Sequence, residues 1–242
     1  MCIRDRSHSP RIVTDGLVLA LDAGNAKSYP GSGTTWTDLS GKGNNGNING
    51  ATHTSGVGGY FSFDGSNDVI SVTSESGIVG QNEITAEAFL KINGNTSNAS
   101  WQGQYLIFRR NSRTSYFEGF TILYNQSNDQ FGAAFADSSG TQKSAYSTST
   151  FSSYPTPIVH VAATFKTNDH VKIYINGALE NTTSHSLTLD LTNADTLQIG
   201  DSNEGWRGYS NASIYNIRVY NKVLTASEIQ QNFNALKGRY GI

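Results

Sequence analysis

The sequence LQIGDSNEGWRGYSNASIYNIRVYNKVLTASEIQQNF, residues 197–233, decides the fold. It predicts a short strand, a loop with acidic residues and glycine, a second strand and a helix, in that order. Apolar and polar side chains alternate over residues 213–220, which is typical of a strand with one buried face. The apolar face would carry Tyr215, Ile217 and Val219, and the polar face Asn216 and Arg218.

The helix after this strand has a well-defined start. Thr225 is a good N-cap residue, and Glu228 stands three positions later, which is the spacing of a capping box. Leu224 and Ile229 have the spacing of a hydrophobic staple, which fixes the angle between a helix and the chain before it. Gly238 suits the end of the helix, since glycine readily adopts the left-handed conformation found there. Strands and turns are predicted elsewhere, so we expect this segment to close the fold.

The composition argues against several classes of protein. Only 15% of the 242 residues are charged and the net charge is −2. A general nucleic-acid or anionic-membrane binder needs a positive field instead. The one basic cluster, Arg109, Arg110 and Arg113, is interpreted as a solvated loop. No apolar run reaches the roughly 18 residues of a transmembrane helix, and no N-terminal segment has the apolar centre of a secretory signal.

The first residues, MCIRDRS, fit no strand or helix pattern. They resemble a non-native leader that recurs at the start of chains translated from environmental DNA assemblies. We therefore expect residues 1–10 to be a non-native or disordered leader and residues 11–242 to be a single domain. The only cysteine, Cys2, lies in this leader. The rest of the chain has no thiol for a disulfide, a zinc–thiolate site or a cysteine nucleophile.

Apolar and alternating runs bounded by Gly, Asn and Asp predict about a dozen strands. In residues 160–180 two such runs precede Asn176-Gly177, the residue pair most suited to a two-residue hairpin turn, which predicts a three-stranded meander. Residues 25–50 read as a long loop, and residues 138–150 have no assignable pattern. The fold class is all-β, an antiparallel two-sheet sandwich of the jelly-roll type with one short C-terminal helix. Other strands are expected at residues 16–22, 60–63, 69–72, 84–92, 105–108, 119–124 and 130–136.

Four segments in order resemble one known family: YFSFDGSNDVI, HVAATF, KIYING and IYNIRVYNKVLTASE, which begin at residues 60, 160, 172 and 214. Together they resemble the laminin-G-like members of the concanavalin A-like lectin and glucanase superfamily, over most of residues 14–233. The resemblance implies two curved antiparallel sheets and a carbohydrate or protein ligand on a concave face or rim. The run QNFNALKGRYGI, which begins at residue 231, also resembles the end of such domains in marine tailed-phage structural proteins.

Catalytic residues of the glucanase type are not evident. A glycosidase needs two carboxylates about 5.5 Å apart for retention, or up to about 9.5 Å apart for inversion. The family's Glu-x-Asp-x-x-Glu strand does not occur in this sequence. The nearest pair on one strand, Glu83 and Glu87, would be about 13 Å apart in extended chain. We therefore predict a non-catalytic protein, with structural or solvent-facing roles for these carboxylates.

Calcium is the cofactor that the resemblance suggests. This hard cation takes six to eight oxygen ligands. In calcium-binding relatives, an Asp/Asn pair before one strand and an acidic loop before the closing strand supply them. The matching residues are Asn67, Asp68, Asp201 and Glu204. The relatives carry more acidic residues in the second loop, and Asn and Asp are also ordinary turn residues. The hypothesis requires the two loops to meet in space.

A sugar site would use an aromatic ring against the apolar face of the sugar, and amides for its hydroxyls. Trp36, Trp101 and Trp206 lie in polar loops, and Asn203 lies within the acidic loop of residues 201–204. These four residues are the candidate ligand-binding residues. The alternative is that each tryptophan covers the core beneath its own loop, because tryptophan is usually well buried.

We therefore predict a non-catalytic recognition or adhesion domain that binds surface carbohydrate. Its expected partners are a glycan or glycoprotein surface, other virion proteins or further copies of the chain, without nucleic acid or membrane insertion. The expected location is a virion, or the extracellular medium and cell surface. Two alternatives stay open: a purely structural interaction domain without a small-ligand site, and a cryptic glycoside hydrolase.

Overall fold

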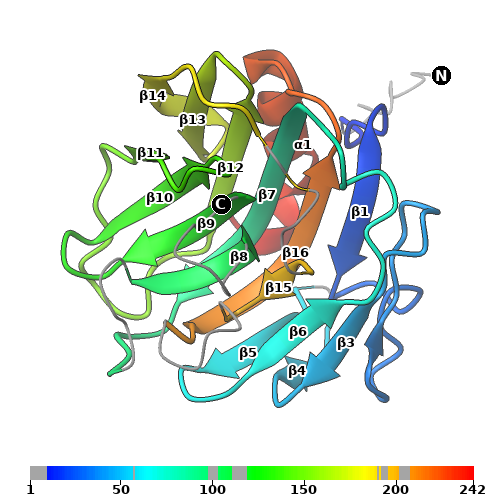
Figure 1. Cartoon of the computed structure of the whole chain (residues 1–242). Coiled ribbons are helices and arrows are strands. Elements are labelled where there is room, and N and C mark those ends of the chain that lie inside the picture. The colour runs from blue at the N-terminus through cyan, green and yellow to red at the C-terminus, as the bar shows by residue number, and fades with distance from the viewer. Residues whose placement is uncertain are drawn as a thin grey trace, which may run out of the picture.

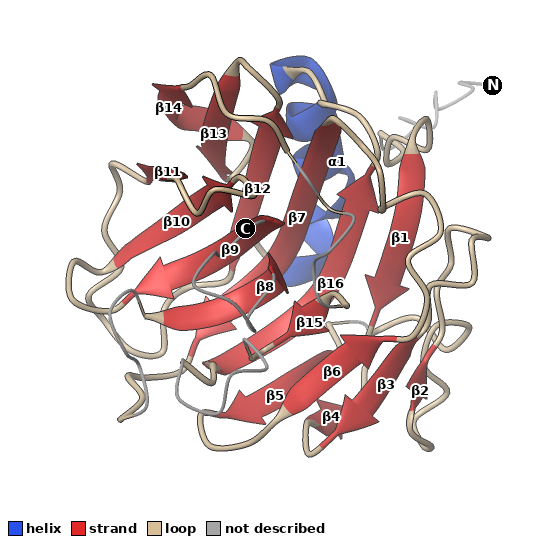
Figure 2. Ribbon diagram, in the orientation of Figure 1, coloured by secondary structure: helices blue, strands red, loops and turns tan. Residues whose placement is uncertain are grey.

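The structure is a computed structural model that describes residues 10–56, 58–97, 103–110, 119–189, 191, 196–201 and 208–242, without the side chain of residue 110. Two antiparallel sheets pack face to face around one apolar core, and a helix covers the outer face of one sheet (Figures 1 and 2). This confirms the predicted all-β jelly-roll sandwich with one C-terminal helix. Nine of the ten residues expected to form a leader lie outside the described residues, so that prediction stays open.

Sheet A has the strand order β14-β13-β12-β7-β16-β5-β4, with β1 also paired to β16. Both β5 and β1 lie on the same edge of β16, one after the other, because β7 occupies its other edge. The strands are β1 (Leu17–Asp22), β4 (Thr52–Thr54), β5 (Tyr60–Asp64), β7 (Glu83–Ile92), β12 (Val159–Lys166), β13 (His170–Ile175), β14 (Ala178–Ser184) and β16 (Asn211–Tyr220).

Sheet B has the strand order β11-β10-β9-β8-β15-β6-β3-β2. Two of its short strands lie in residues 25–50, and β11 lies in residues 138–150, where the sequence shows no clear strand pattern. The strands are β2 (Thr35–Trp36), β3 (Gly46–Asn49), β6 (Val69–Val72), β8 (Gln104–Arg110), β9 (Gly119–Asn125), β10 (Gln130–Ala136), β11 (Gln142–Tyr146) and β15 (Gln198–Ile199).

Strand β16 departs from simple alternation. Its register with β7 shifts between Ile214 and Asn216, which marks a β-bulge at Tyr215. A bulge sets two residues against one on the partner strand. The side chains beyond it therefore point to the face opposite to the one that simple alternation predicts. Tyr215 therefore packs on the helix side, whereas Ile217 and Val219 point into the sandwich core. The prediction that these three side chains share one face is wrong for Tyr215.

Helix α1 (Ala226–Tyr240) covers the outer face of sheet A. Thr225 and Glu228 form the predicted capping box, and Leu224 shares an apolar cluster with Ile229, as a staple requires. The helix ends at Gly241, which has a left-handed φ of 72°, and not at the predicted Gly238. Because the helix packs against them, β7 and β16 are buried on both faces. In Figure 1 α1 lies behind these two strands.

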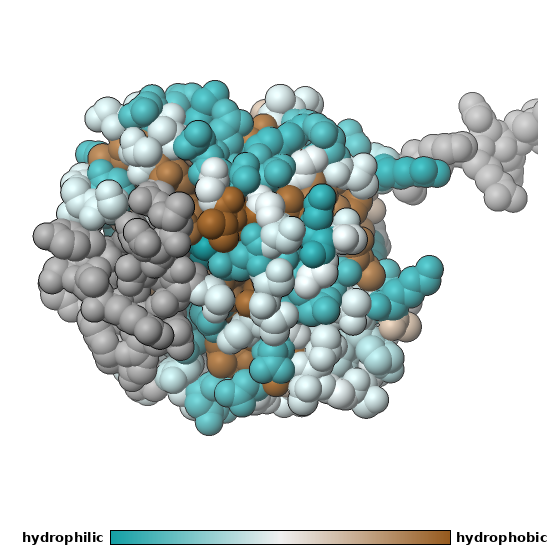
Figure 3. All heavy atoms as spheres, turned by 45° about the vertical axis from the view of Figure 1, so that its right-hand side comes forward, coloured by the Kyte–Doolittle hydropathy of each residue, from teal (hydrophilic) through white to brown (hydrophobic). Residues whose placement is uncertain are grey.

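The side of the molecule with β1 and β3 has a largely hydrophilic surface. Figure 3, which turns this side forward, shows hydrophobic residues only in small groups among hydrophilic and neutral ones. Small separate groups of this kind are normal on a globular protein. In the described part of the chain, no helix combines the length and the apolar character needed to cross a membrane.

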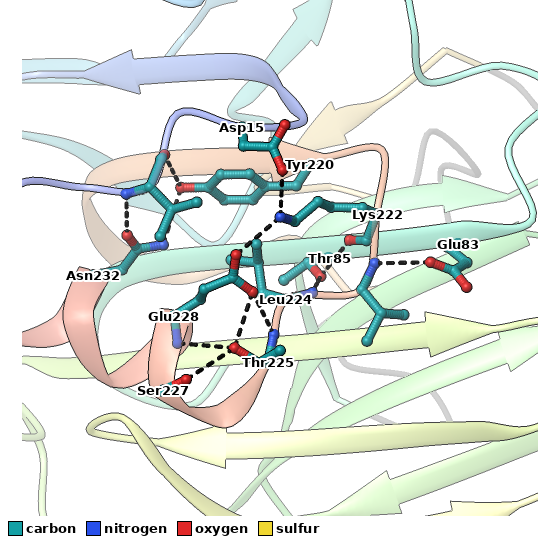
Figure 4. A network of polar contacts seen from close by, with 12 residues as sticks. Asp15, Glu83, Thr85, Tyr220, Lys222, Leu224, Thr225, Ser227, Glu228 and Asn232 are labelled. Carbon is teal, nitrogen blue, oxygen red and sulfur yellow. Dashed lines mark hydrogen bonds and ion pairs between the residues drawn. The ribbon is translucent and has the colours of Figure 1, made fainter.

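The segment before β1 is tied to the helix and to the end of β16 (Figure 4). Asn232 accepts a hydrogen bond of 2.7 Å from the Val13 N–H, and the Tyr220 hydroxyl donates to the Val13 carbonyl oxygen over 3.1 Å. Lys222 bridges the carboxylates of Asp15 and Glu228 at 2.6 and 2.9 Å. The two ends of the described chain thus hold each other in place.

Candidate functional site

The residues proposed for calcium lie at the ends of two neighbouring strands. Asp68 directly precedes β6, and Asp201 follows β15 by two positions. Strands β15 and β6 pair with Ile199 opposite Ile70. The pairing ends at Ile199, since Gly200 has a left-handed φ of 84° and separates Asp201 from the strand. The two loops that the calcium hypothesis requires to meet therefore start from adjacent strands.

The Asp68 carboxyl is buried beside a second acid. It accepts a hydrogen bond of 2.9 Å from the Asp64 N–H. Burial raises the pKa of Asp68; the bond from the Asp64 N–H opposes this, and the negative charge of the Asp64 carboxylate adds to it. A bound cation would offset both the cost of burying the Asp68 charge and its repulsion by Asp64. Asn67 is exposed next to it, and Asp201 is buried.

The rest of the predicted calcium set is incomplete in the described part of the chain. Glu204 lies outside the described residues. Within them, no group of three or more His, Cys, Asp or Glu side chains is arranged to hold a metal ion. Calcium needs six to eight oxygens, so backbone carbonyls, amides or water would have to complete a site that starts from Asp68 and Asp201.

Trp36 does not lie where a sugar could reach it. Its side chain is 0% exposed, and its ring centroid lies 4.7 Å from that of Phe61 in the core. Strand β2 pairs with β3 so that Trp36 stands opposite Gly46 and points inward. The prediction that Trp36 binds ligand is therefore wrong, and it covers the core instead. The other three candidates, Trp101, Asn203 and Trp206, lie outside the described residues.

The arginine cluster also differs from its interpretation as a solvated loop. Arg109 is buried, and its guanidinium binds both carboxylate oxygens of Glu75 at 2.7 and 2.9 Å. Such a bidentate pair orders the chain between β6 and β7 against β8. The side chain of Arg110 and all of Arg113 lie beyond the described residues.

A row of side chains crosses the outer face of sheet B from one edge to the other. Pairing registers between successive strands place one residue of each strand in line, and the next residue along several of these strands points into the core. We call this line the cross-sheet row. It consists of Ser144, Ala134, Thr121, Phe108, Gln198, Ser71, Asn47 and Thr35.

Three residues at one end of the cross-sheet row are polar and accessible. Thr35 and Asn47 are exposed, and Ser71 is half-buried. The Ser71 hydroxyl donates a hydrogen bond of 2.7 Å to the Gln198 side-chain oxygen, and the Gln198 amide donates to the Thr196 hydroxyl over 3.1 Å. Hydroxyls and amides on neighbouring strands thus form a continuous polar strip.

Aromatic side chains adjoin the polar strip on the same face. Tyr105 and Phe108 are in edge-to-face contact, with ring centroids 5.2 Å apart, and they cluster with Leu123 and Tyr146. Gly132 leaves room for the Tyr146 ring, since a Cβ there would lie 2.6 Å from that ring. Tyr105, Phe108 and Leu123 are themselves buried, so Tyr146, which is half-buried, is the member of this cluster that a ligand could contact. Sequence reasoning missed this face, because it is assembled from eight strands whose order is not local.

The one strand-borne carboxylate pair identified in the sequence cannot act as a catalytic pair. Glu87 is 0% exposed and lies beneath α1, where Arg218 binds it at 2.6 Å and His160 at 3.3 Å. Burial would raise the pKa of Glu87, but the charge of Arg218 and the hydrogen bond from His160 outweigh it and lower the pKa to about 2. Glu83 is instead half-exposed and paired with Lys166. Glu87 is therefore structural.

These features define a lectin-type sandwich, and sequence comparison agrees. The family model described as the concanavalin A-like lectin/glucanases superfamily, Laminin_G_3, matches residues 64–230. The chain therefore belongs to this superfamily. No curated protein sequence matches it significantly.

Several solved structures share the fold at low sequence identity. The binding domain of Paraclostridial mosquitocidal protein 1 has a TM-score of 0.68 and 17% identity, over 92% of this chain and 52% of that one. The binding domain of botulinum neurotoxin DC in complex with SialylT has a TM-score of 0.66 and 17% identity, over 92% and 52%. Trypanosoma rangeli sialidase in complex with the inhibitor DANA has a TM-score of 0.68 and 17% identity, over 94% and 35%. The chain spans about half the length of the toxin chains, and at these identities the likeness concerns the fold alone.

Proposed function

We propose that this chain is a non-catalytic recognition domain that binds carbohydrate on the outer face of sheet B. The cross-sheet row carries the proposal, because Thr35, Asn47 and Ser71 present accessible hydroxyl and amide groups side by side on three neighbouring strands. Membership of a lectin superfamily supports it, as does the shared fold with a toxin binding domain in complex with SialylT. The sugar would place its hydroxyls on Thr35, Asn47 and Ser71.

A glycan array separates this proposal from its rivals. The double variant Thr35→Ala/Asn47→Ala removes two exposed polar groups from the row, and Thr54→Ala removes an exposed hydroxyl from sheet A as the matched control. We expect the double variant to bind at least about tenfold more weakly, as the loss of one to two hydrogen bonds implies. Unchanged affinity in the double variant would exclude this face. If the unaltered chain binds no glycan, the structural interaction domain is the better explanation.

The same array tests for catalysis. The chain belongs to a superfamily that includes glucanases, and a sialidase chain shares its fold. Our proposal that the chain is not an enzyme rests on Glu87, which lies buried beneath α1 and therefore cannot reach a substrate. Array glycans should therefore be recovered intact by mass spectrometry after prolonged incubation. Shortened glycans would favour the cryptic glycosidase.

We extend the proposal to calcium at the strand ends that carry Asp68 and Asp201. A cation that binds only the folded state raises the melting temperature. Millimolar calcium should therefore raise the melting temperature of the unaltered chain relative to chelator, and Asp68→Asn should abolish the difference. Asp137→Asn, which alters an acidic turn beyond β10, is the control. Identical melting curves with calcium and with chelator would remove calcium from the proposal.

The proposed setting is the surface of a virion or a cell, with glycoproteins, other virion proteins or further copies of the chain as partners. The resemblance of the last residues to phage structural proteins motivates the virion. Neighbouring genes that encode tail or capsid proteins would support it. Neighbours that encode secretion or cell-wall proteins would favour a bacterial adhesin.

A further inference from the structure

A hollow of about 390 Å³ lies where the turn after β1 faces the edge strand β4. One wall comes from this turn and from the loop before β2, and the other from His53 in β4 and the loop after it. All of its lining residues lie between positions 23 and 56. The family match begins at residue 64, so this feature belongs to the part of the chain that the family model does not cover.

The floor of the hollow is anchored to the core by aromatic contacts. The Tyr29 ring is 8% exposed and lies edge-on to the rings of His53 and Phe61, with centroid distances of 4.6 and 4.9 Å. Phe61 in turn contacts Trp36 in the centre of the sandwich. The Tyr29 hydroxyl donates to the Gly33 carbonyl oxygen over 3.0 Å. The floor is therefore rigid, and binding there would cost little ordering of side chains.

Several polar groups on the walls have unused hydrogen-bonding capacity. His53 Nε2 lies 2.9 Å from the Ala23 carbonyl oxygen. A carbonyl can only accept, so Nε2 carries the proton, and Nδ1 of the neutral ring is left as an acceptor. Among the described residues nothing pairs with Nδ1, the Ser55 hydroxyl or the N–H groups of Ala26 and Gly31. One acceptor, one hydroxyl and two donors without a described partner thus belong to residues that line the hollow.

We propose that this hollow is a second binding site, which takes a single neutral sugar unit. Its volume falls in the lower part of the range for small-molecule pockets, roughly 300–1,000 Å³. The apolar face of a pyranose ring would lie over Tyr29 and His53, and its hydroxyls would meet the unused donors and acceptors. No described residue that lines the hollow carries a permanent charge. An acidic sugar would have to bury its carboxylate there without a cation, which is costly.

The proposal takes its ligand class from the proposed function but uses none of the residues of the cross-sheet row. Amide NMR spectra of the whole chain, titrated with the methyl glycosides of glucose, galactose, N-acetylglucosamine and sialic acid, test it directly. At least one neutral glycoside should shift the signals of Ala26, Gly31 and Ser55, and the sialic acid glycoside should not. If no neutral glycoside shifts these signals, or if only the acidic one does, the proposal is overturned.

Variants then assign the binding to the hollow. Ala26→Trp would fill the space from an exposed position and should abolish the shifts, while His53→Ala should weaken binding about tenfold or more through the lost acceptor and ring. Thr54→Ala, next to His53 on β4 but outside the lining, is the control. Unchanged affinity in Ala26→Trp contradicts the proposal even if His53→Ala fails to fold. Thr35→Ala/Asn47→Ala should leave these shifts intact, so the failure of either site can be seen separately.

Discussion

Glu87 belongs to β7, and its side chain lies between the sheet and α1, where the carboxylate binds Arg218, His160 and Asn232. Removing one partner of a buried ion pair leaves the other charge uncompensated. Glu87→Gln should therefore lower the free energy of unfolding by about 3–5 kcal/mol, measured by urea denaturation. Glu83→Gln, four residues earlier in a half-exposed pair with Lys166, should cost about 1 kcal/mol or less. Similar losses for both variants would contradict the structural role of Glu87.

The same carboxyl predicts how stability depends on pH. The pKa of Glu87 is lowered from 4.5 to about 2 in the folded chain. Its contribution is therefore present above pH 4.5, the unfolded value, and is lost as the pH falls towards 2. The loss amounts to about 3 kcal/mol for this one group. Denaturation curves between pH 6 and about 2 should show this decline, and Glu87→Gln should flatten it.

Single side chains were the least predictable feature of the sequence. The carboxylate at position 87 could be recognised, but not its partner Arg218, which lies 131 positions later. Trp36 was placed correctly in a long polar segment, yet nothing local showed that a two-residue strand would turn it into the core. In both cases a distant strand supplies the environment of the side chain.

Local sequence signals predicted where helices and turns begin more reliably than they predicted the surroundings of single side chains. The capping box and the staple gave the start of α1, and Asn176-Gly177, both with left-handed φ angles, gave the hairpin between β13 and β14. The end of the helix was misjudged because two glycines, Gly238 and Gly241, stand close together. Only the second one adopts the left-handed conformation.

These two glycines give a matched pair of variants. Gly238 lies inside α1, and a Cβ there would meet nothing within 4 Å. Gly238→Ala should raise the free energy of unfolding by about 0.5–1 kcal/mol, because alanine is the better helix former. Gly241→Ala should lower it by about 1 kcal/mol, since its φ of 72° strains any residue with a Cβ. Thermal melting checks both signs, and equal signs would contradict this assignment of the helix end.

At the scale of the whole molecule, the sandwich could be predicted but the strand order could not. Hairpins such as β9–β10 and β12–β13 join neighbours in sequence, so their alternating patterns sufficed. Strand β15 lies between β8 and β6, which are far from it in the chain. The cross-sheet row depends on that insertion, and so it became visible only in the assembled sheet.

Helix α1 gives a prediction for the molecule as a whole. It covers the ion pair of Glu87 and Arg218 and two apolar clusters on sheet A. A chain that stops at Asn221 would expose all of them, so we expect loss of the cooperative melting transition and binding of a hydrophobic dye. A cooperative transition with near-native melting temperature would show instead that the helix is dispensable.

The position of β16 has a consequence for synthesis on the ribosome. Strands β1, β5 and β7 all pair with it, yet it is made after every one of them. Until residue 211 and those that follow it emerge, each of these three strands has an open edge turned towards a missing neighbour. Open edges invite pairing with other chains, and non-local pairing is slow. Nascent chains of this protein should therefore depend on chaperones, or on well-separated ribosomes, until β16 has been translated.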